Sequence, residues 1–161
     1  MQQRLAPCSP FWQKGSVFML HLIIGPHGSG KSRQMTARIQ HAATVSNGNV
    51  VCITHRTSLR QHIPHTVRLI ALSEFGELCT FHEVYAFVCG LLSGNYDISD
   101  VFLDAENAVP DATPAELTLF LALLSELAGT REVTITVALS AQRADVPDEL
   151  CQMAADVYFC E

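Results

Sequence analysis

A glycine-rich run of eight residues carries the side chains with the clearest capacity for chemistry. It has glycine, four further residues, and then glycine, lysine and serine, in the order Gly25, Pro26, His27, Gly28, Ser29, Gly30, Lys31 and Ser32. In a loop of this spacing, successive backbone amides surround phosphate oxygens, and the lysine neutralises the β- and γ-phosphates. The serine hydroxyl is placed to ligate Mg²⁺. The run therefore predicts a cup for nucleotide phosphates, with His27 either beside the phosphates or facing solvent.

The residues on either side of this run agree with a phosphate loop. The apolar stretch 17–24 predicts a buried strand before it, and Met35, Ile39 and Ala42 recur at helical spacing after it. The order of strand, glycine loop and helix directs the positive end of a helix dipole at the phosphates. A chance turn rich in glycine and serine is the alternative, and the flanking pattern favours the phosphate loop.

A carboxylate that would hold the water shell of the metal follows another buried strand. This strand is predicted at 101–103, and Asp104 comes directly after it. Hydrolysis also needs a group that orients the attacking water, and Glu106 is the nearest candidate. Two interpretations of Glu106 stay open, a catalytic base and a solvated loop carboxylate. We predict Ser32 and Asp104 as the metal residues, and Lys31 and Glu106 as the catalytic residues.

Polar residues also follow the strand predicted at 133–139. Ser140 ends this strand, and Gln142 and Arg143 come shortly after it. Because ligands bind at the carboxyl ends of the strands in open α/β sheets, these side chains are candidates for sensing the γ-phosphate. The alternative is that they are ordinary loop residues.

Strands alternate with helices along the chain. Two Thr-x-x-Glu capping boxes, at 80–83 and 113–116, predict helix starts, and a short helix is predicted over 145–154. Apolar runs predict strands at 17–24, 50–54, 67–72, 101–103, 133–139 and 157–160. The alternation predicts an α/β fold of three layers, α/β/α, with a parallel sheet covered by helices on both faces.

Length and composition fit one domain of this kind. The chain has 161 residues, of which 48% are hydrophobic, enough for a substantial core. We expect a loose leader at 1–16 and one nucleotide-binding domain at 17–161. No apolar run reaches the length of about 20 residues that crosses a bilayer, and the six cysteines form no Cys-x-x-Cys pair. We therefore expect buried free thiols and a cytoplasmic protein without membrane contact.

Charge is divided unevenly along the chain. Eight of the ten lysines and arginines precede Glu74, and all 16 acidic residues lie at or after it. Phosphate binding in one half and metal binding in the other account for part of this asymmetry. Three interpretations of the remaining basic surplus stay open: binding of nucleic acid or another polyanion, a solvated surface, and a contact between subunits. The surplus consists of Arg56, Arg60, Arg68, His55, His62 and His65.

The chain resembles P-loop NTPases in the segments LHLIIGPHGSGKS, VVCITHR, VFLDAEN and VTITVALSAQR. The resemblance is to the division with an additional strand between the Walker A and Walker B strands, which includes RecA-like ATPases, and more weakly to the core of type II thymidine kinases. It implies a sheet in the order 5-1-4-3-2, with the strand at 17–24 beside the strand at 133–139. Those kinases resemble Asp-Glu-x-Gln where this chain has Asp104-Ala105-Glu106-Asn107, and they carry a C-terminal segment with zinc-binding cysteines, whereas this chain ends at its last core strand.

Three functions follow as expectations. The first is binding of a purine nucleoside triphosphate, ATP or GTP, with slow Mg²⁺-dependent hydrolysis by a small ATPase or switch. The second is a nucleoside kinase of the thymidine-kinase type, for which the sequence offers little material for an arginine-bearing lid. The third is a nucleotide-binding module that works through contacts without catalysis. The core shows no arginine finger, so one would come from another copy of the chain or from a protein partner.

Overall fold

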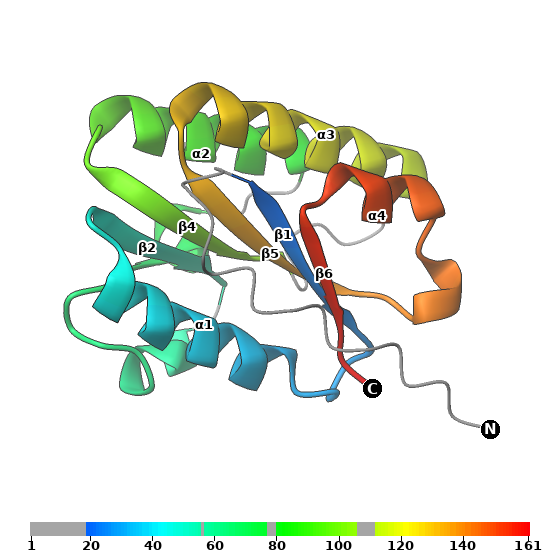
Figure 1. Ribbon diagram of the computed structural model, residues 1–161, viewed down its shortest axis with the longest axis horizontal. Coiled ribbons are helices and arrows are strands. Elements are labelled where there is room, and N and C mark those ends of the chain that lie inside the picture. Colours follow the sequence, from blue (N-terminus) through cyan, green and yellow to red (C-terminus); the bar gives the residue numbers. More distant parts are fainter. Residues whose placement is uncertain (1–18, 56, 77–79, 106–111) are drawn as a thin grey trace.

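The computed structural model describes residues 19–55, 57–76, 80–105 and 112–161. Six parallel strands form one sheet, and helices cover both of its faces (Figure 1). The elements in chain order are β1 (Leu20–Gly25), α1 (Lys31–Val45), β2 (Asn49–Thr54), η2 (Thr57–Gln61), β3 (Arg68–Ala71), η3 (Leu72–Phe75), α2 (Phe81–Gly94), β4 (Ile98–Asp104), α3 (Pro114–Arg131), β5 (Thr134–Ser140), η4 (Arg143–Asp145), α4 (Asp148–Met153) and β6 (Asp156–Phe159). The α/β fold with a parallel sheet between helices is therefore confirmed.

The order of the strands differs from the predicted order. The sheet runs β3-β2-β4-β5-β1-β6, whereas 5-1-4-3-2 has places for only five strands. The difference arises because β3 adds a sixth strand at one edge, where it pairs with β2 through Cys52 opposite Leu69. The expected neighbourhood of the first strand and the strand near 133–139 is present, with Leu22 opposite Val137.

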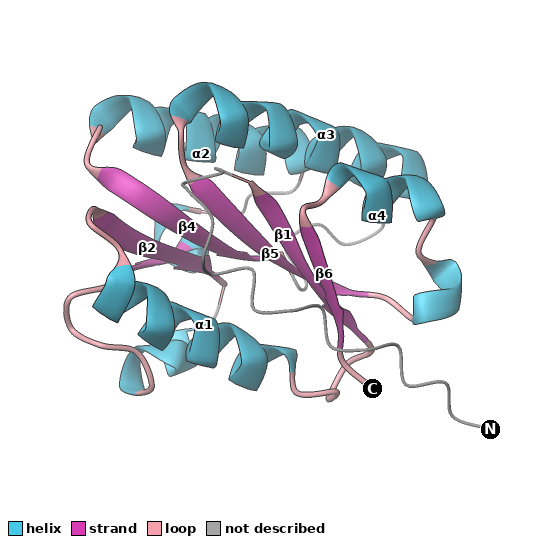
Figure 2. Ribbon diagram, viewed as in Figure 1, coloured by secondary structure: helices cyan, strands magenta, loops and turns pink. Residues whose placement is uncertain are grey.

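Two hydrophobic clusters lie on the two faces of the sheet. On one face, α2, α3 and α4 cover β1, β4 and β5; on the other, α1 and η2 pack against the same sheet (Figure 2). Successive side chains of a strand point to opposite faces, so Leu22 and Ile24 join the first cluster while Ile23 joins the second. The sheet is thus buried on both sides, as the apolar runs of the sequence predict.

Both predicted capping boxes are present. Thr80 Oγ1 accepts a hydrogen bond from the Glu83 amide at 3.2 Å, and the Glu83 carboxylate accepts one from the Thr80 amide at 2.9 Å. Thr113 and Glu116 repeat this exchange at the start of α3, at 3.2 and 2.8 Å. Each box satisfies amides that a helix start leaves without a partner, which is why α2 and α3 begin where the sequence predicts.

Several boundaries differ from the predicted ones. The strand predicted at 101–103 extends over Ile98–Asp104, and Ser140 is the last residue of β5 rather than the residue after it. The helix predicted at 145–154 is shorter, because the turn η4 precedes it and Pro147 caps it. The leader predicted at 1–16 lies outside the described residues.

Cysteine burial is less complete than expected. Of the four cysteines in the described segments, Cys52 is fully buried, while Cys89, Cys151 and Cys160 are half-buried, and all four are free thiols. Cys52 lies in the interior strand β2, whereas Cys151 lies in α4 and Cys160 directly follows the edge strand β6. Within the described ranges, no helix has the length and apolar character to cross a membrane.

Candidate phosphate-binding site

The glycine-rich run forms the connection between β1 and α1. Gly28 and Gly30 have φ angles of 81° and 89°, in the left-handed region that glycine adopts without strain. The Ser29 amide donates a hydrogen bond to the Pro26 carbonyl at 3.2 Å and closes a tight turn. The chain therefore reverses direction around its own amides directly at the end of β1.

Several amides of this loop are available to an anion. The amides of Gly28 and Gly30 have no acceptor within the described part of the chain. Gly30 caps α1 without a side-chain hydrogen bond, and no acidic residue occupies the first turn. The first amides of a helix have no partner inside the helix, and its dipole adds positive potential at that end. The start of α1 thus differs from the capped starts of α2 and α3 and suits a phosphate.

Lys31 and Ser29 add polar atoms to the same loop. Lys31 is 3% exposed, and its Nζ donates a hydrogen bond to the Pro26 carbonyl at 2.7 Å, across the loop. The Ser29 hydroxyl is buried and makes no hydrogen bond to any described residue. A buried hydroxyl without a partner is costly, so this atom fits a site that a ligand completes. Ser32 is exposed at the second position of α1.

Asp104 lies at the carboxyl end of β4, two strands from β1, and is 7% exposed. Thr54 Oγ1, at the end of the neighbouring strand β2, donates a hydrogen bond to its carboxylate at 3.2 Å. Cys52 and Phe102 pack in the cluster of α1, and side chains alternate along strands. Thr54 and Asp104 therefore lie on the α1 face of the sheet, the face on which Lys31 begins the helix.

The register places Gly25, Ser140 and Asp104 together at the carboxyl ends of three adjacent strands. Gly25 lies opposite Ser140, and Asp104 lies opposite Ala138. Because one strand separates β1 from β4, their ends are roughly 10 Å apart at the usual spacing of strands. Ser140, which is exposed, ends the strand between them. This distance between the two strand ends is about the size of a phosphate together with a hydrated metal ion.

The donor set fits magnesium held mainly by nucleotide. No group of three or more His, Cys, Asp or Glu side chains in the described ranges is arranged to hold a metal ion. Magnesium commonly keeps several waters and uses one or two protein oxygens together with substrate phosphates. Ser32 and Asp104 match that mode, and they match no site that would bind the metal in the absence of phosphates.

Arg143 contacts an aromatic ring of the last strand, and its role in sensing the γ-phosphate stays a prediction. Its guanidinium lies over the ring of Phe159, 4.9 Å from the ring centroid. Phe159 belongs to β6, on the side of β1 opposite to Asp104. Gln142 is exposed, and Glu106 lies outside the described residues, so its role stays a prediction. Ala105, directly after Asp104, is buried in the core.

Two neighbours of the site were not identified from the sequence. Thr54 bonds Asp104, and its position at the end of a buried strand is a signal that would have found it. Cys160 donates its amide to the Ile24 carbonyl at 2.7 Å, and a Cβ added to Gly25 would lie 2.8 Å from Cys160 Cβ. Burial raises the pKa of the Cys160 thiol, and the charges of Lys31 and Arg38 oppose this shift. Only the pairing of β6 with β1 brings Cys160 to the loop.

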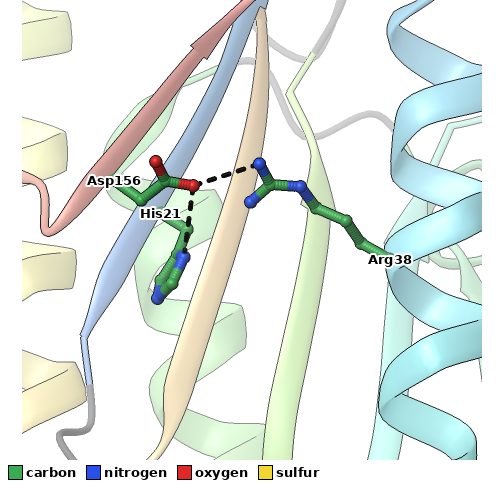
Figure 3. Close-up of polar contacts among 3 residues, drawn as sticks. All are labelled: His21, Arg38 and Asp156. Atoms are coloured by element: carbon green, nitrogen blue, oxygen red, sulfur yellow. Dashed lines mark hydrogen bonds and ion pairs between the residues drawn. The ribbon is translucent and has the colours of Figure 1, made fainter. Parts of the chain in front are cut away.

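A charged cluster fastens α1 to the edge of the sheet (Figure 3). Arg38 of α1 donates to the Asp156 carboxylate of β6 at 3.1 Å, and His21 Nδ1 of β1 lies 3.9 Å from the same oxygen. Burial lowers the pKa of His21, Arg38 lowers it further, and Asp156 raises it. The cluster holds the helix that begins with Lys31 against the two strands beside the phosphate loop.

A pocket of about 390 Å³ opens at the same end of the sheet, on the face of α2, α3 and α4. The ends of β1, β4 and β5 form its floor, where Ser140 borders it. Its lining is mainly apolar, with Asp145 as the charged residue among those that line it. None of the described residues that line the pocket carries a positive charge, so the lining offers no cation to a phosphorylated ligand.

His55 directly follows Thr54 at the carboxyl end of β2, and the rest of the described basic surplus lies elsewhere. Arg60, His62, His65 and Arg68 are exposed in the segment from η2 to β3. This segment ends in the edge strand β3, which is separated from β1 by three strands. Arg56 lies outside the described residues. Polyanion binding through this segment stays a prediction, and the segment does not join the phosphate loop.

A scan against models of known protein families finds no match to this chain, and neither does a search of curated proteins. The sequence motif and the geometry above therefore carry the functional argument.

Proposed function

We propose that the protein binds a purine nucleoside triphosphate together with Mg²⁺ at the loop 25–32, with ATP as the first candidate. We propose further that it hydrolyses this nucleotide slowly. The observation that carries this proposal is the glycine loop between β1 and α1. Within the residues that the structure describes, it combines amides without acceptors, a buried Lys31 and a buried Ser29 hydroxyl that makes no hydrogen bond. Asp104 ends a strand of the same sheet at the same edge.

The arrangement of the strands supports the resemblance to P-loop NTPases. When β3 is left out, the remaining strands run β2-β4-β5-β1-β6. Numbered in chain order and read from the β6 edge, this is 5-1-4-3-2. The element labelled β5 is strand 4 of this order. It is the additional strand, because it lies between β1, which carries the phosphate loop, and β4, which ends in Asp104.

The proposed chemistry depends on position and charge. The amides of the loop and the start of α1 bind the α- and β-phosphates, and the Lys31 ammonium neutralises the β- and γ-phosphates. Ser32 and Asp104 would hold the magnesium ion, and the chemistry that it would supply is to draw negative charge away from the transferred phosphoryl group. Thr54 fixes the Asp104 carboxylate through its hydrogen bond. Ser140, the last residue of β5, is the candidate for a contact with the γ-phosphate.

Slow turnover is the expected rate behaviour. The residue after Asp104 is the buried Ala105, which offers no carboxylate to orient water. Glu106 would have to supply this function, and a copy or partner would have to supply an arginine. Binding without turnover would therefore support the non-catalytic nucleotide module and would not contradict the site.

Isothermal titration of Lys31→Met with MgATP tests the site. Methionine is unbranched and only one atom shorter than lysine, and it removes the charge, so the fold should remain and the Kd should rise at least about tenfold. Arg131→Ala, an exposed arginine on α3, is the matched control and should bind as the original protein does. Unchanged affinity of a folded Lys31→Met protein would falsify the assignment.

The pocket beside Ser140 favours a second candidate, a kinase that transfers the γ-phosphoryl group to a small molecule. Its floor is formed by the ends of β1, β4 and β5, next to the phosphate loop. Transfer of labelled phosphate from ATP to a panel of nucleosides separates this candidate from an ATPase. Labelled inorganic phosphate as the sole product supports hydrolysis, and a labelled nucleotide supports the kinase.

A further inference from the structure

We propose that the nucleobase lies over the end of β6 and stacks on the guanidinium of Arg143, which the ring of Phe159 supports from the other side. The proposal rests on the nucleotide-binding function proposed above and adds the place and chemistry of base recognition. It assigns Arg143 a contact with the base in place of the predicted contact with the γ-phosphate.

The order of the strands gives the bound nucleotide a direction. Lys31 begins the helix after β1, and Asp104 ends β4, so the β- and γ-phosphates and the metal occupy the side of the loop toward β5 and β4. The base is at the opposite end of the nucleotide. It therefore extends to the other side of β1, where the neighbouring strand is β6.

Arg143 and Phe159 form the proposed platform for the base. Backbone hydrogen bonds of residues close to each of them in the chain connect the platform to the start of the phosphate loop. The Cys160 amide, next to Phe159 in the chain, donates to the Ile24 carbonyl at 2.7 Å. The Ala141 amide, two residues before Arg143, donates to the Gly25 carbonyl at 3.2 Å. The platform is thus connected to the loop by backbone bonds from both sides of β1.

The geometry of Arg143 suits stacking. Its guanidinium carbon is 4.9 Å from the centroid of the Phe159 ring, and the residue is exposed, so a ligand can reach it. Its side chain makes no hydrogen bond or ion pair in the described segments. Arg38 stacks on Tyr158 at 5.8 Å, but it bonds Asp156 and its side chain is 15% exposed. Of these two arginines that lie over rings of β6, Arg143 is therefore the one available to a base.

Stacking defines the class of nucleotide. A guanidinium plane recognises the flat surface of a base and not its hydrogen-bonding edge, and a purine offers the larger surface. We expect ATP and GTP to bind with similar Kd values and CTP and UTP to bind more weakly. This preference deepens the purine specificity proposed for the site.

Titrations with MgATP and with magnesium tripolyphosphate, which has no base, test this inference. We expect Arg143→Ala to raise the Kd for MgATP roughly tenfold and to leave the Kd for tripolyphosphate unchanged. Arg143→Lys keeps the charge and loses the plane, so it should behave as Arg143→Ala does. Phe159→Leu should weaken MgATP alone, and Arg131→Ala is the control that should change neither Kd. Circular dichroism establishes that each variant is folded.

The other outcomes are equally decisive. Weaker binding of both ligands by Arg143→Ala, with recovery in Arg143→Lys, would assign Arg143 to the phosphates and overturn the stacking proposal. Unchanged MgATP affinity in all three variants would also overturn it, while the phosphate site would stand if Lys31→Met loses both ligands. Failure of the original protein to bind either ligand would remove the proposed function together with this inference.

Discussion

Cys52 and Asp104 show how the surroundings of a side chain determine its chemistry. Cys52 lies in β2, in the hydrophobic cluster on the α1 face of the sheet, and Asp104 ends the adjacent strand. Burial, with a smaller contribution from the Asp104 charge, raises the pKa of the Cys52 thiol to about 12. Asp104 in turn accepts a hydrogen bond from Thr54 and borders the edge of the sheet where the metal is proposed to bind. The Cys52 thiol is thus unreactive, whereas the Asp104 carboxylate lies where the proposed metal would bind.

We predict that Cys52 does not react with a thiol reagent at pH 8 in the folded protein. Its thiolate is almost absent at that pH, and the side chain is inaccessible. Mass spectrometry after labelling with and without guanidinium measures this, and the half-buried Cys151 is the internal comparison. Labelling of Cys52 under native conditions, at the rate of Cys151, would show that β2 is not enclosed.

The same shift predicts a pH dependence of stability. The unfolded thiol loses its proton near pH 9, its ordinary value, and the folded thiol near 12. Below pH 9 both states hold the proton, so the thiol has no effect there. As pH rises from about 9 to about 12, only the unfolded state releases the proton, and the free energy of unfolding falls. Cys52→Ala should reduce this fall in urea titrations at pH 8 and 10.5.

Helix α1 is attached to the sheet by polar contacts at its middle and at its C-terminal end. Arg38 bonds Asp156 of the edge strand β6, and the Ser46 hydroxyl at the helix end donates to the Asp100 carboxylate of β4. These contacts add direction to the apolar packing of Met35 and Ile39. They fix the helix so that its uncapped start remains at the end of β1.

We predict that Asp156→Asn lowers the free energy of unfolding by about 1 kcal/mol, because Arg38 loses its charged partner while Asp156 is half-exposed. The pKa of His21 should fall further, since Asp156 raises it in the native cluster. Urea titration and an NMR titration of the histidine ring measure the two effects. Asp97→Asn, an exposed residue in the turn before β4, is the control. A rise in the pKa of His21 would contradict the role of Asp156.

Local sequence patterns predicted most of the helices and strands. They did not predict contacts between segments that are far apart in the chain. Apolar runs and capping boxes indicate where strands and helices form, so α2 and α3 begin at the expected residues. Arg38 and Asp156 are 118 residues apart, and nothing near either residue indicates the other. The stack of Arg143 on Phe159 likewise depends on the passage of the chain from β5 over β1 to β6. The edge position of β3 depends on pairing, which its short apolar run does not specify.

The two clusters share one sheet, so the described residues should unfold together. Leu124 of α3 is fully buried in one cluster, whereas Cys52 belongs to the other. Loss of packing on one face removes support from strands that form the floor of the opposite face. The fold therefore couples the α1 side, which carries the phosphate loop, to the α3 side, which carries the pocket.

We predict that Leu124→Ala lowers the free energy of unfolding by about 2–5 kcal/mol, through lost burial and the cavity that remains. In urea, reactivity of Cys52 should appear at the same concentration at which the helical circular dichroism signal is lost. Both midpoints should shift together in the variant. A Cys52 midpoint that stays at the original value would show that the two faces unfold separately.

The neighbours of β1 have a consequence for the newly made chain. Strand β1 pairs with β5 and β6, and 109 positions separate Gly25 from Thr134. At a synthesis rate of about 5–20 residues per second, this apolar strand leaves the ribosome roughly 5–20 seconds before its first partner does. During that interval the nascent polypeptide exposes a strand that adheres to other strands, so its yield in a cell should depend on chaperones that shield the early segment until translation has passed β5.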